Sequence, residues 1–142
     1  MTKTRLFPLA SLLMLLVMFA TACGPASPAG LSDEAMLEVT SNALSAIDAN
    51  DYTAFTRDFS DEMLAAFPES QFTQMHDLLQ GSSGNFVACG DFSLSNKQGF
   101  ALYRIICEYE QEDVVVTIVF KIDGTQVEGL FFDSPNLRTA SQ

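Results

Sequence analysis

Four strand-like segments fill the second half of the chain, and the short turns between them restrict its fold more than any other sequence feature. They cover residues 85–94, 100–110, 114–122 and 126–132, and all are rich in β-branched and aromatic residues. Connections this short join antiparallel neighbours. The sequence therefore predicts a four-stranded antiparallel meander.

The turn residues predict how these strands pair. Asp123-Gly124 is typical of a two-residue hairpin turn, and Gln111-Glu112 is a weaker turn of the same length. Residues 97–99 predict a three-residue loop with Gly99 in the left-handed conformation. With that loop, counting outward places Cys89 directly opposite Cys107. The pair is predicted to be non-hydrogen-bonded, with Cα atoms about 4.5 Å apart, which a disulfide accepts.

The same register divides the strand residues between two faces of the sheet. The face predicted to lie against the helices carries Val87, Cys89, Tyr103, Ile105, Cys107, Tyr109, Val114, Val116, Ile118, Phe120, Val127 and Phe131. The other face is too apolar to meet only water, which is typical of an interface. Its predicted patch consists of Phe92, Leu102, Ile106, Val119 and Leu130, with Arg104, Lys121 and Glu128 at the edge. The alternative is that the tether and the C-terminal tail half cover this face.

Residues 32–84 are predicted to be helical. Ser32 is a candidate N-cap and is followed by two acidic residues in the first helical turn. Apolar residues then recur at helical spacing. Asp51 and Ser60 begin shorter helices, and a last helix ends in the segment 81–84. Helices followed by an antiparallel sheet indicate a segregated α+β domain, with the N-terminal helices packed on a curved four-stranded sheet.

The N-terminus carries an export signal. Lys3 and Arg5 precede an apolar run over residues 6–20, which is shorter than the roughly 20 residues of a membrane span. Ala20-Thr21-Ala22-Cys23 resembles the lipobox of bacterial lipoproteins. The resemblance implies lipidation of the Cys23 thiol and cleavage before it. The alternative is an ordinary secretory signal with an incidental cysteine.

These features divide the chain into four parts. We expect a signal peptide over 1–22, a lipidated flexible tether over 23–30, one α+β domain over 31–135 and a C-terminal tail over 136–142. The product would be extracytoplasmic and lipid-anchored, in the cell membrane or in an outer membrane if the host has one. In that oxidising compartment, Cys89 and Cys107 are predicted to form a disulfide.

Composition restricts the partners of the mature chain. Removing the two signal-peptide cations leaves five basic residues against 18 acidic ones. This balance disfavours nucleic-acid binding, which needs a basic surface. A single histidine makes a histidine-based metal site improbable, and we expect no metal and no cofactor. The acidic residues between Glu108 and Asp113 are predicted to be a solvated hairpin tip rather than a calcium loop.

Several segments carry a family resemblance. They are Gln71-Phe72, His76-Asp77-Leu78-Leu79, Gly84-Asn85-Phe86, Val119-Phe120-Lys121-Ile122-Asp123-Gly124 and Val127-Glu128-Gly129-Leu130-Phe131-Phe132. They resemble an uncharacterised family of bacterial extracytoplasmic domains in the nuclear-transport-factor-2-like superfamily. The resemblance spans roughly residues 31–135 and implies a cone-shaped α+β fold. It also implies the possibility of sheet-to-sheet pairing.

The resemblance further suggests a candidate catalytic pocket. Enzymes of the superfamily, isomerases and dehydratases, use an Asp or a His in the mouth of the cone. The predicted register places Asp91 on the inner face, where burial would raise its pKa and favour a role as general base. Candidate neighbours are His76, Tyr52, Tyr103 and Tyr109. The alternatives are a solvated Asp91 on an irregular strand after Gly90 and a His76 on a helix surface.

The leading hypothesis is a non-catalytic, membrane-tethered module. It would bind a small apolar ligand in the cone, or a second copy or an envelope protein through the outer sheet face. One alternative is an isomerase- or dehydratase-like enzyme with Asp91 as base. The other is a structural or accessory envelope protein. Fold analogy alone does not indicate an activity.

Overall fold

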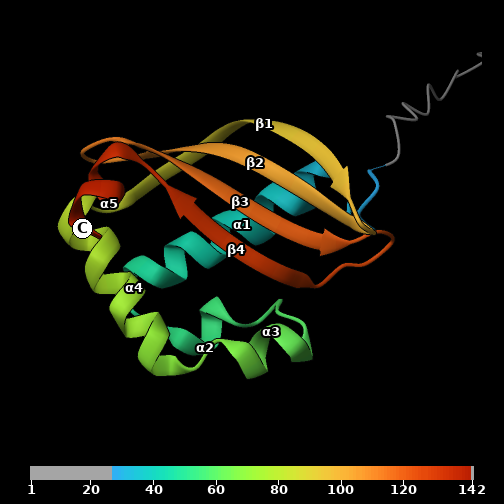
Figure 1. The fold of residues 1–142 in the computed structure, drawn as a ribbon, viewed down its shortest axis with the longest axis horizontal. Coiled ribbons are helices and arrows are strands. Elements are labelled where there is room, and N and C mark those ends of the chain that lie inside the picture. The colour runs from blue at the N-terminus through green and yellow to red at the C-terminus, as the bar shows by residue number, and fades with distance from the viewer. Residues whose placement is uncertain (1–26, 142) are drawn as a thin grey trace, which may run out of the picture.

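The computed structural model describes residues 27–141 and shows an α+β domain in which helices are followed by a four-stranded antiparallel sheet (Figure 1). The elements are α1 (Asp33–Asp48), α2 (Tyr52–Phe55), α3 (Asp61–Ala66), α4 (Glu69–Ser82), β1 (Phe86–Lys97), β2 (Phe100–Tyr109), β3 (Asp113–Lys121), β4 (Val127–Asp133) and α5 (Pro135–Ala140). The fold class and the four strands predicted from the sequence are confirmed.

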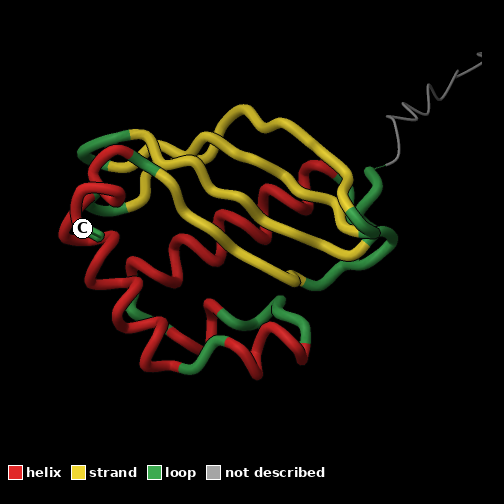
Figure 2. Tube along the Cα trace, viewed as in Figure 1, coloured by secondary structure: helices red, strands yellow, loops and turns green. Residues whose placement is uncertain are grey.

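The sheet has the order β1-β2-β3-β4, so every strand pairs with its neighbour in the chain. The sheet is curved, and α1 runs along one face while α2 and α3 lie farther out on that side (Figures 1 and 2). The central strands alternate strictly, and their buried residues complete the core with α1 and α4. Those strand residues are Tyr103, Ile105, Cys107, Tyr109, Val114, Val116, Ile118 and Phe120.

Side-chain caps begin the first three helices where the sequence predicts them. Ser32 caps α1, Asp51 caps α2 and Ser60 caps α3, each by accepting a hydrogen bond from a backbone N–H three residues later. Before α4, Pro68 occupies the cap position without a side-chain bond. Helix α1 is long enough to cross the sheet, and it buries Met36, Leu44 and Ile47 against it.

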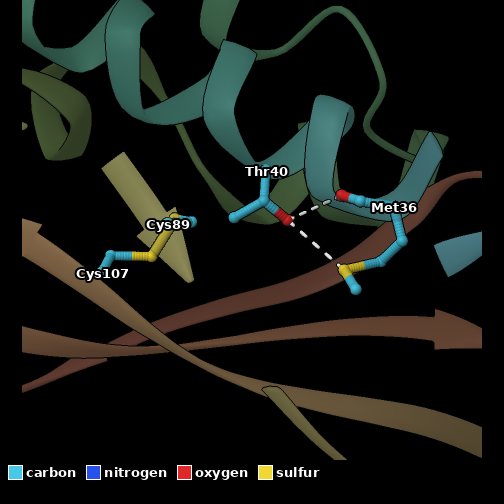
Figure 3. Close-up of a disulfide and its surroundings, with 4 residues drawn as sticks. All are labelled: Met36, Thr40, Cys89 and Cys107. Atoms are coloured by element: carbon cyan, nitrogen blue, oxygen red, sulfur yellow. Dashed lines mark hydrogen bonds between the residues drawn. A yellow bond between two sulfur atoms is a disulfide. The ribbon is translucent and has the colours of Figure 1, made fainter. Parts of the chain in front are cut away.

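The predicted Cys89–Cys107 disulfide is present, but the turn used to predict it is wrong. Lys97 pairs with Phe100, so the loop has two residues, Gln98 and Gly99, both with positive φ. This turn alone would shift Cys89 away from Cys107. A β-bulge between Cys89 and Phe92 adds one residue to β1 and restores the pairing. The Cα atoms are 4.1 Å apart, and the bond lies beside α1 (Figure 3).

Bulges in the edge strands also correct the predicted faces. Beyond the β1 bulge, Phe92 pairs with the buried Ile105 and packs against the core. In β4 a second irregularity near Glu128 turns Leu130 and Phe132 inward and Phe131 outward. The predicted outer placement of Phe92 and Leu130 is therefore wrong, and so is the inner placement of Val87 and Phe131, which are exposed.

The other two turns differ from the prediction by short distances. Tyr109 N donates to Glu112 O, so the β2–β3 turn is centred on residues 110–111 rather than 111–112. Between β3 and β4 the chain makes a turn closed by Gly124 N and Lys121 O and then continues to Val127. The connection is thus longer than a two-residue hairpin. Neither change alters which faces of β2 and β3 are buried.

Residues 27–30 are packed on the domain, although the sequence predicts a flexible tether over 23–30. Asp123 N donates to Pro28 O at 2.9 Å, and Gly30 N donates to Gly124 O at 2.8 Å. Ala29 is buried. The segment is thus hydrogen-bonded to the β3–β4 turn. Residues 23–26 lie outside the described residues.

The C-terminal segment is also structured. Residues 136–142 are predicted to be a tail, but Pro135–Ala140 forms α5, with Pro135 in its first turn and Ser134 as N-cap. Leu137 is buried beside α4 and β4. Among the described residues, no helix combines the length and apolar character needed to span a bilayer.

Candidate functional site

Aromatic side chains pack the space between the helices and the sheet, where the sequence predicts a pocket. Tyr103 lies with its ring centroid 5.7 Å from that of Phe92 and 6.0 Å from that of Phe120. On the helical side, Phe55 contacts Phe72 at 5.0 Å, and further contacts involve Tyr52, Phe59 and Phe67. The candidate pocket residues are therefore core residues or lie outside this layer.

Asp91 does not face the helices. It follows Gly90 in the β1 bulge, and its side chain is exposed. Shallow surface hollows place it beside Ile106, Arg104 and Glu108, which belong to the outer face of β2. The predicted inner-face position of Asp91 is wrong because the register shifts at the bulge. The burial that would have favoured a general base there is absent.

His76 and Tyr52 do not join a common site. His76 Nδ1 lies 3.0 Å from a carboxylate oxygen of Asp77 on the same helix. The Tyr52 hydroxyl donates to Phe67 O at 2.8 Å, and its ring packs on Phe72. The polar groups of both side chains thus have partners on the helices or in the loops beside them. His76 and Tyr52 therefore contribute to the packing of the helices and not to a shared site.

Tyr103 and Tyr109 both point into the interior from β2. The Tyr103 hydroxyl is hydrogen-bonded to the Ser27 hydroxyl, which belongs to the docked N-terminal segment. Tyr109 is 4% exposed, and its hydroxyl has no hydrogen-bond partner among the described residues. Burial raises the pKa of Tyr109, and the negative charge of Asp48 raises it further.

Asp48 makes hydrogen bonds between separate elements, and the sequence analysis did not predict them. Its two carboxylate oxygens accept hydrogen bonds from Phe86 N at 2.9 Å and from Gln80 Nε2 at 3.0 Å. It thereby links the end of α1 to α4 and to the start of β1. Burial raises the pKa of Asp48, although these hydrogen bonds favour its ionised form. An acidic residue in the last helical turn opposes the helix dipole and could have indicated a specific role.

Glu112 is a second carboxylate that sequence reasoning did not single out. It accepts hydrogen bonds from Ser83 Oγ at 2.7 Å, Ser134 Oγ at 2.6 Å and Asn136 N at 3.2 Å. Burial pushes the pKa of Glu112 upward, but these hydrogen bonds outweigh it and hold the pKa below its usual range. Glu112 thus joins the β2–β3 turn to the end of α4 and to α5.

Acidification is expected to release α5. The pKa of Glu112 is lower in the folded chain than its ordinary value of 4.5, so its contribution to stability is present above that value. The contribution is lost as the pH falls through the folded-state pKa. An NMR titration of the Leu137 methyl groups measures the release. In Glu112→Gln these signals should already be displaced at neutral pH, whereas signals that stay fixed until global unfolding would contradict the prediction.

The outer sheet face is apolar in the structure, although only part of the predicted patch lies on it. Of the predicted patch, Leu102, Ile106 and Val119 lie there, and they pair across strands with Val119, Val115 and Gly129 respectively. Ile106 is 51% exposed and Phe131 is 61% exposed. A Cβ built on Gly129 would lie 3.1 Å from the Phe131 ring, so this ring folds over the glycine. We define the outer patch as Leu102, Ile106, Val115, Val119 and Phe131.

A groove borders the outer patch at β4. It has a volume of about 350 Å³ and lies between α4, β4 and α5. Its apolar lining consists of Met75, Leu78, Leu79, Leu130, Phe131, Phe132 and Leu137. The ion pair between Arg138 and Asp133, with atoms 2.5 Å apart, lies at the polar side. Phe131 belongs to both the groove and the outer patch.

The described residues hold no group of three or more His, Cys, Asp or Glu side chains arranged to bind a metal ion. The carboxylates of the acidic hairpin instead accept hydrogen bonds from backbone and side-chain donors of the same chain. Glu110 accepts from Asn85 N and Asn85 Nδ2 at 3.0 and 3.1 Å. These hydrogen bonds lower the pKa of Glu110.

Comparison with known proteins identifies a family. No curated protein matches the chain. Residues 41–130 match the model of a family described as a protein of unknown function, DUF3887. The matched segment runs from within α1 to β4 and includes both cysteines of the disulfide. The chain therefore belongs to the DUF3887 family.

Proposed function

We propose that the chain is an extracytoplasmic lipoprotein, anchored through Cys23, whose domain binds a partner without catalysing a reaction. The observation that carries the proposal is the position of Phe131, a large apolar side chain that is 61% exposed. It joins the outer patch to the α4–β4–α5 groove in one continuous apolar surface. Such surfaces on small domains are typical of binding sites.

We infer that the fold is the cone of the nuclear-transport-factor-2-like superfamily. Two features support this inference. The sheet is a curved antiparallel meander, and the helices α1 to α3 lie on one side of it (Figure 1). In such a domain the outer sheet face is available for pairing with a second sheet, which agrees with the apolar outer patch.

For a small apolar ligand we propose a different position from the cone interior that the sequence predicts. Tyr103, Phe120 and Phe55 fill the interior of the domain. The groove beside Phe131 has a volume of about 350 Å³, within the range of small-molecule sites. A ligand of this kind would therefore lie between α4 and β4 rather than under the sheet.

A protein partner or a second copy is expected on the outer patch. Arg104 lies in its middle, paired across the sheet with Thr117. An apolar patch with one central cation suits an interface, since exposed patches of this kind are rare on isolated domains. Anchoring many copies to one membrane raises their effective concentration and favours pairing.

Replacing Val119 with Lys should abolish association while preserving the fold. Val119 is partly exposed on the outer patch, so the new charge would meet water in a monomer and would be buried unpaired in a complex. Sedimentation velocity of the unlipidated chain from residue 24 onward, at micromolar concentration, measures the effect. Ile122→Lys, at the exposed β3–β4 turn, is the matched control. A monomeric parent chain would exclude the homodimer, and an unfolded Val119→Lys chain would show that this face is core.

The lipid anchor has its own test. Cys23→Ser removes the thiol that forms the thioether, so incorporation of a labelled fatty acid should fall to background and the protein should remain an unprocessed or unlipidated precursor. Cys89→Ala/Cys107→Ala, which removes the other two cysteines, is the control and should keep its label. Undiminished labelling of Cys23→Ser would disprove the anchor.

A further inference from the structure

The segment that precedes α1 is fastened to one end of the sheet. Besides the two backbone hydrogen bonds to the β3–β4 turn, the Ser27 hydroxyl is bonded to the hydroxyl of Tyr103. In an antiparallel meander the β1–β2 and β3–β4 turns lie at the same end, and the β2–β3 turn lies at the other. The chain thus enters the domain at the end formed by these two turns, far from α5 (Figure 1).

We propose that this end of the domain lies against the lipid headgroups and that the α4–α5 end faces away from the membrane. The proposal rests on the lipid anchor at Cys23. Ser27 is four residues beyond Cys23, a distance of at most about 14 Å. The headgroup layer is about 5–8 Å thick on each side of a bilayer. The linker is therefore too short to carry the domain away from the surface.

The turns at the anchored end expose a cation and an apolar side chain that suit a headgroup layer. At the anchored end the turns carry the exposed Lys97 and Ile122, the latter 42% exposed, and they include the single acid Asp123. The first turn of α1 adds Asp33 and Glu34 at that end, and Glu62 and Glu128 lie beside Lys121 there. At the opposite end, the hairpin formed by residues 108–113 carries four acidic residues. Acidic residues thus lie at both ends, and the short linker rather than the charge sets the orientation.

The orientation leaves the proposed binding surface accessible. The groove is lined by residues of α4, β4 and α5, including Phe131, and α5 lies at the far end of the sheet (Figure 1). Strand β3, Asp113–Lys121, is about 30 Å long at 3.3 Å per residue. A partner in the extracytoplasmic space can therefore reach the groove without displacing lipid.

Single tryptophans can test the orientation, because the chain has no tryptophan of its own. Thr125→Trp places the reporter in the β3–β4 turn, and Gln111→Trp places it in the β2–β3 turn. Both residues are exposed in the structure. The lipidated proteins are reconstituted into phosphatidylcholine–phosphatidylglycerol vesicles that carry a headgroup nitroxide quencher. The tryptophan at 125 should be quenched several-fold more strongly than the one at 111.

The outcomes separate the orientation from the anchor. Vesicle flotation, with the chain from residue 24 onward as the unlipidated control, reports the anchor alone. Proteins that float but show equal quenching at both positions, or stronger quenching at 111, would overturn the orientation and leave the anchor standing. Lipidated proteins that do not float would overturn both.

Gly30→Ala tests whether the docked segment sets the orientation. A Cβ at this position would lie 2.7 Å from the Asp123 carbonyl oxygen, so the segment must move away from the turn. In the Gly30→Ala background the difference in quenching between 125 and 111 should shrink, while flotation is unchanged. Gly24→Ala, within the short linker, is the control and should keep the full difference. An undiminished difference in Gly30→Ala would overturn the role of the docked segment.

Discussion

Phe55→Ala is expected to lower the free energy of unfolding by about 3–5 kcal/mol, the range found for buried Phe-to-Ala substitutions. Phe55 is almost completely buried and contacts three other phenylalanine rings, Phe59, Phe67 and Phe72. Its removal leaves a cavity at the junction of α2, α3 and α4, which short helices cannot easily close. Urea unfolding followed by circular dichroism measures the change.

Phe131→Ala is the matched control. The substitution is chemically identical, but Phe131 is 61% exposed, and the expected change is within about 0.5 kcal/mol. Equal losses in the two variants would mean that the helical layer is not part of the core. A large loss in Phe131→Ala alone would mean that the outer patch is covered within the monomer.

Loss of the Cys89–Cys107 disulfide is expected to cost about 3 kcal/mol according to the loop-entropy description. The bond joins residues 18 positions apart in β1 and β2, on the helix side of the sheet. Without it, the segment of β1 before the bulge is held by strand pairing and by the hydrogen bond from Phe86 N to Asp48. Unfolding of the oxidised chain and of the chain in excess dithiol gives the difference directly.

Cys89→Ala/Cys107→Ala is the second arm of this experiment. It should match the reduced wild type apart from the small loss of buried volume, and dithiol should no longer affect it. Peptide mapping of exported protein without reductant should recover residues 89 and 107 in one linked pair. Two free thiols in that material would contradict the bond.

Local sequence patterns predicted the helix starts and the central strands correctly. Ser32, Asp51 and Ser60 cap helices because a side-chain oxygen needs only the next turn of its own chain. The alternation in β2 and β3 predicted the buried face, since both strands have a neighbour on each side and no irregularity between them. These are short-range effects, and the sequence contains them.

The edge strands could not be predicted in the same way. A β-bulge inserts one residue and reverses every later side chain, yet it leaves no periodic signal. Asp91, Phe92 and Leu130 were therefore placed on the wrong faces. The predicted pairing of Cys89 with Cys107 is nevertheless correct. The real turn is one residue shorter than predicted, and the β1 bulge adds one residue, so the two differences cancel in the register.

Only the tertiary structure decided which distant segments meet. Three carboxylate hydrogen bonds bring Glu112 together with α4 and α5, and two backbone bonds fasten residues 28 and 30 to the β3–β4 turn. The segment before α1, which is rich in Gly, Pro and Ala, and the short C-terminal segment have no periodic sequence pattern that predicts their structure. Their order arises from contacts with a sheet that must already be folded, so the sequence alone determined the layers of this domain while tertiary packing decided its ends.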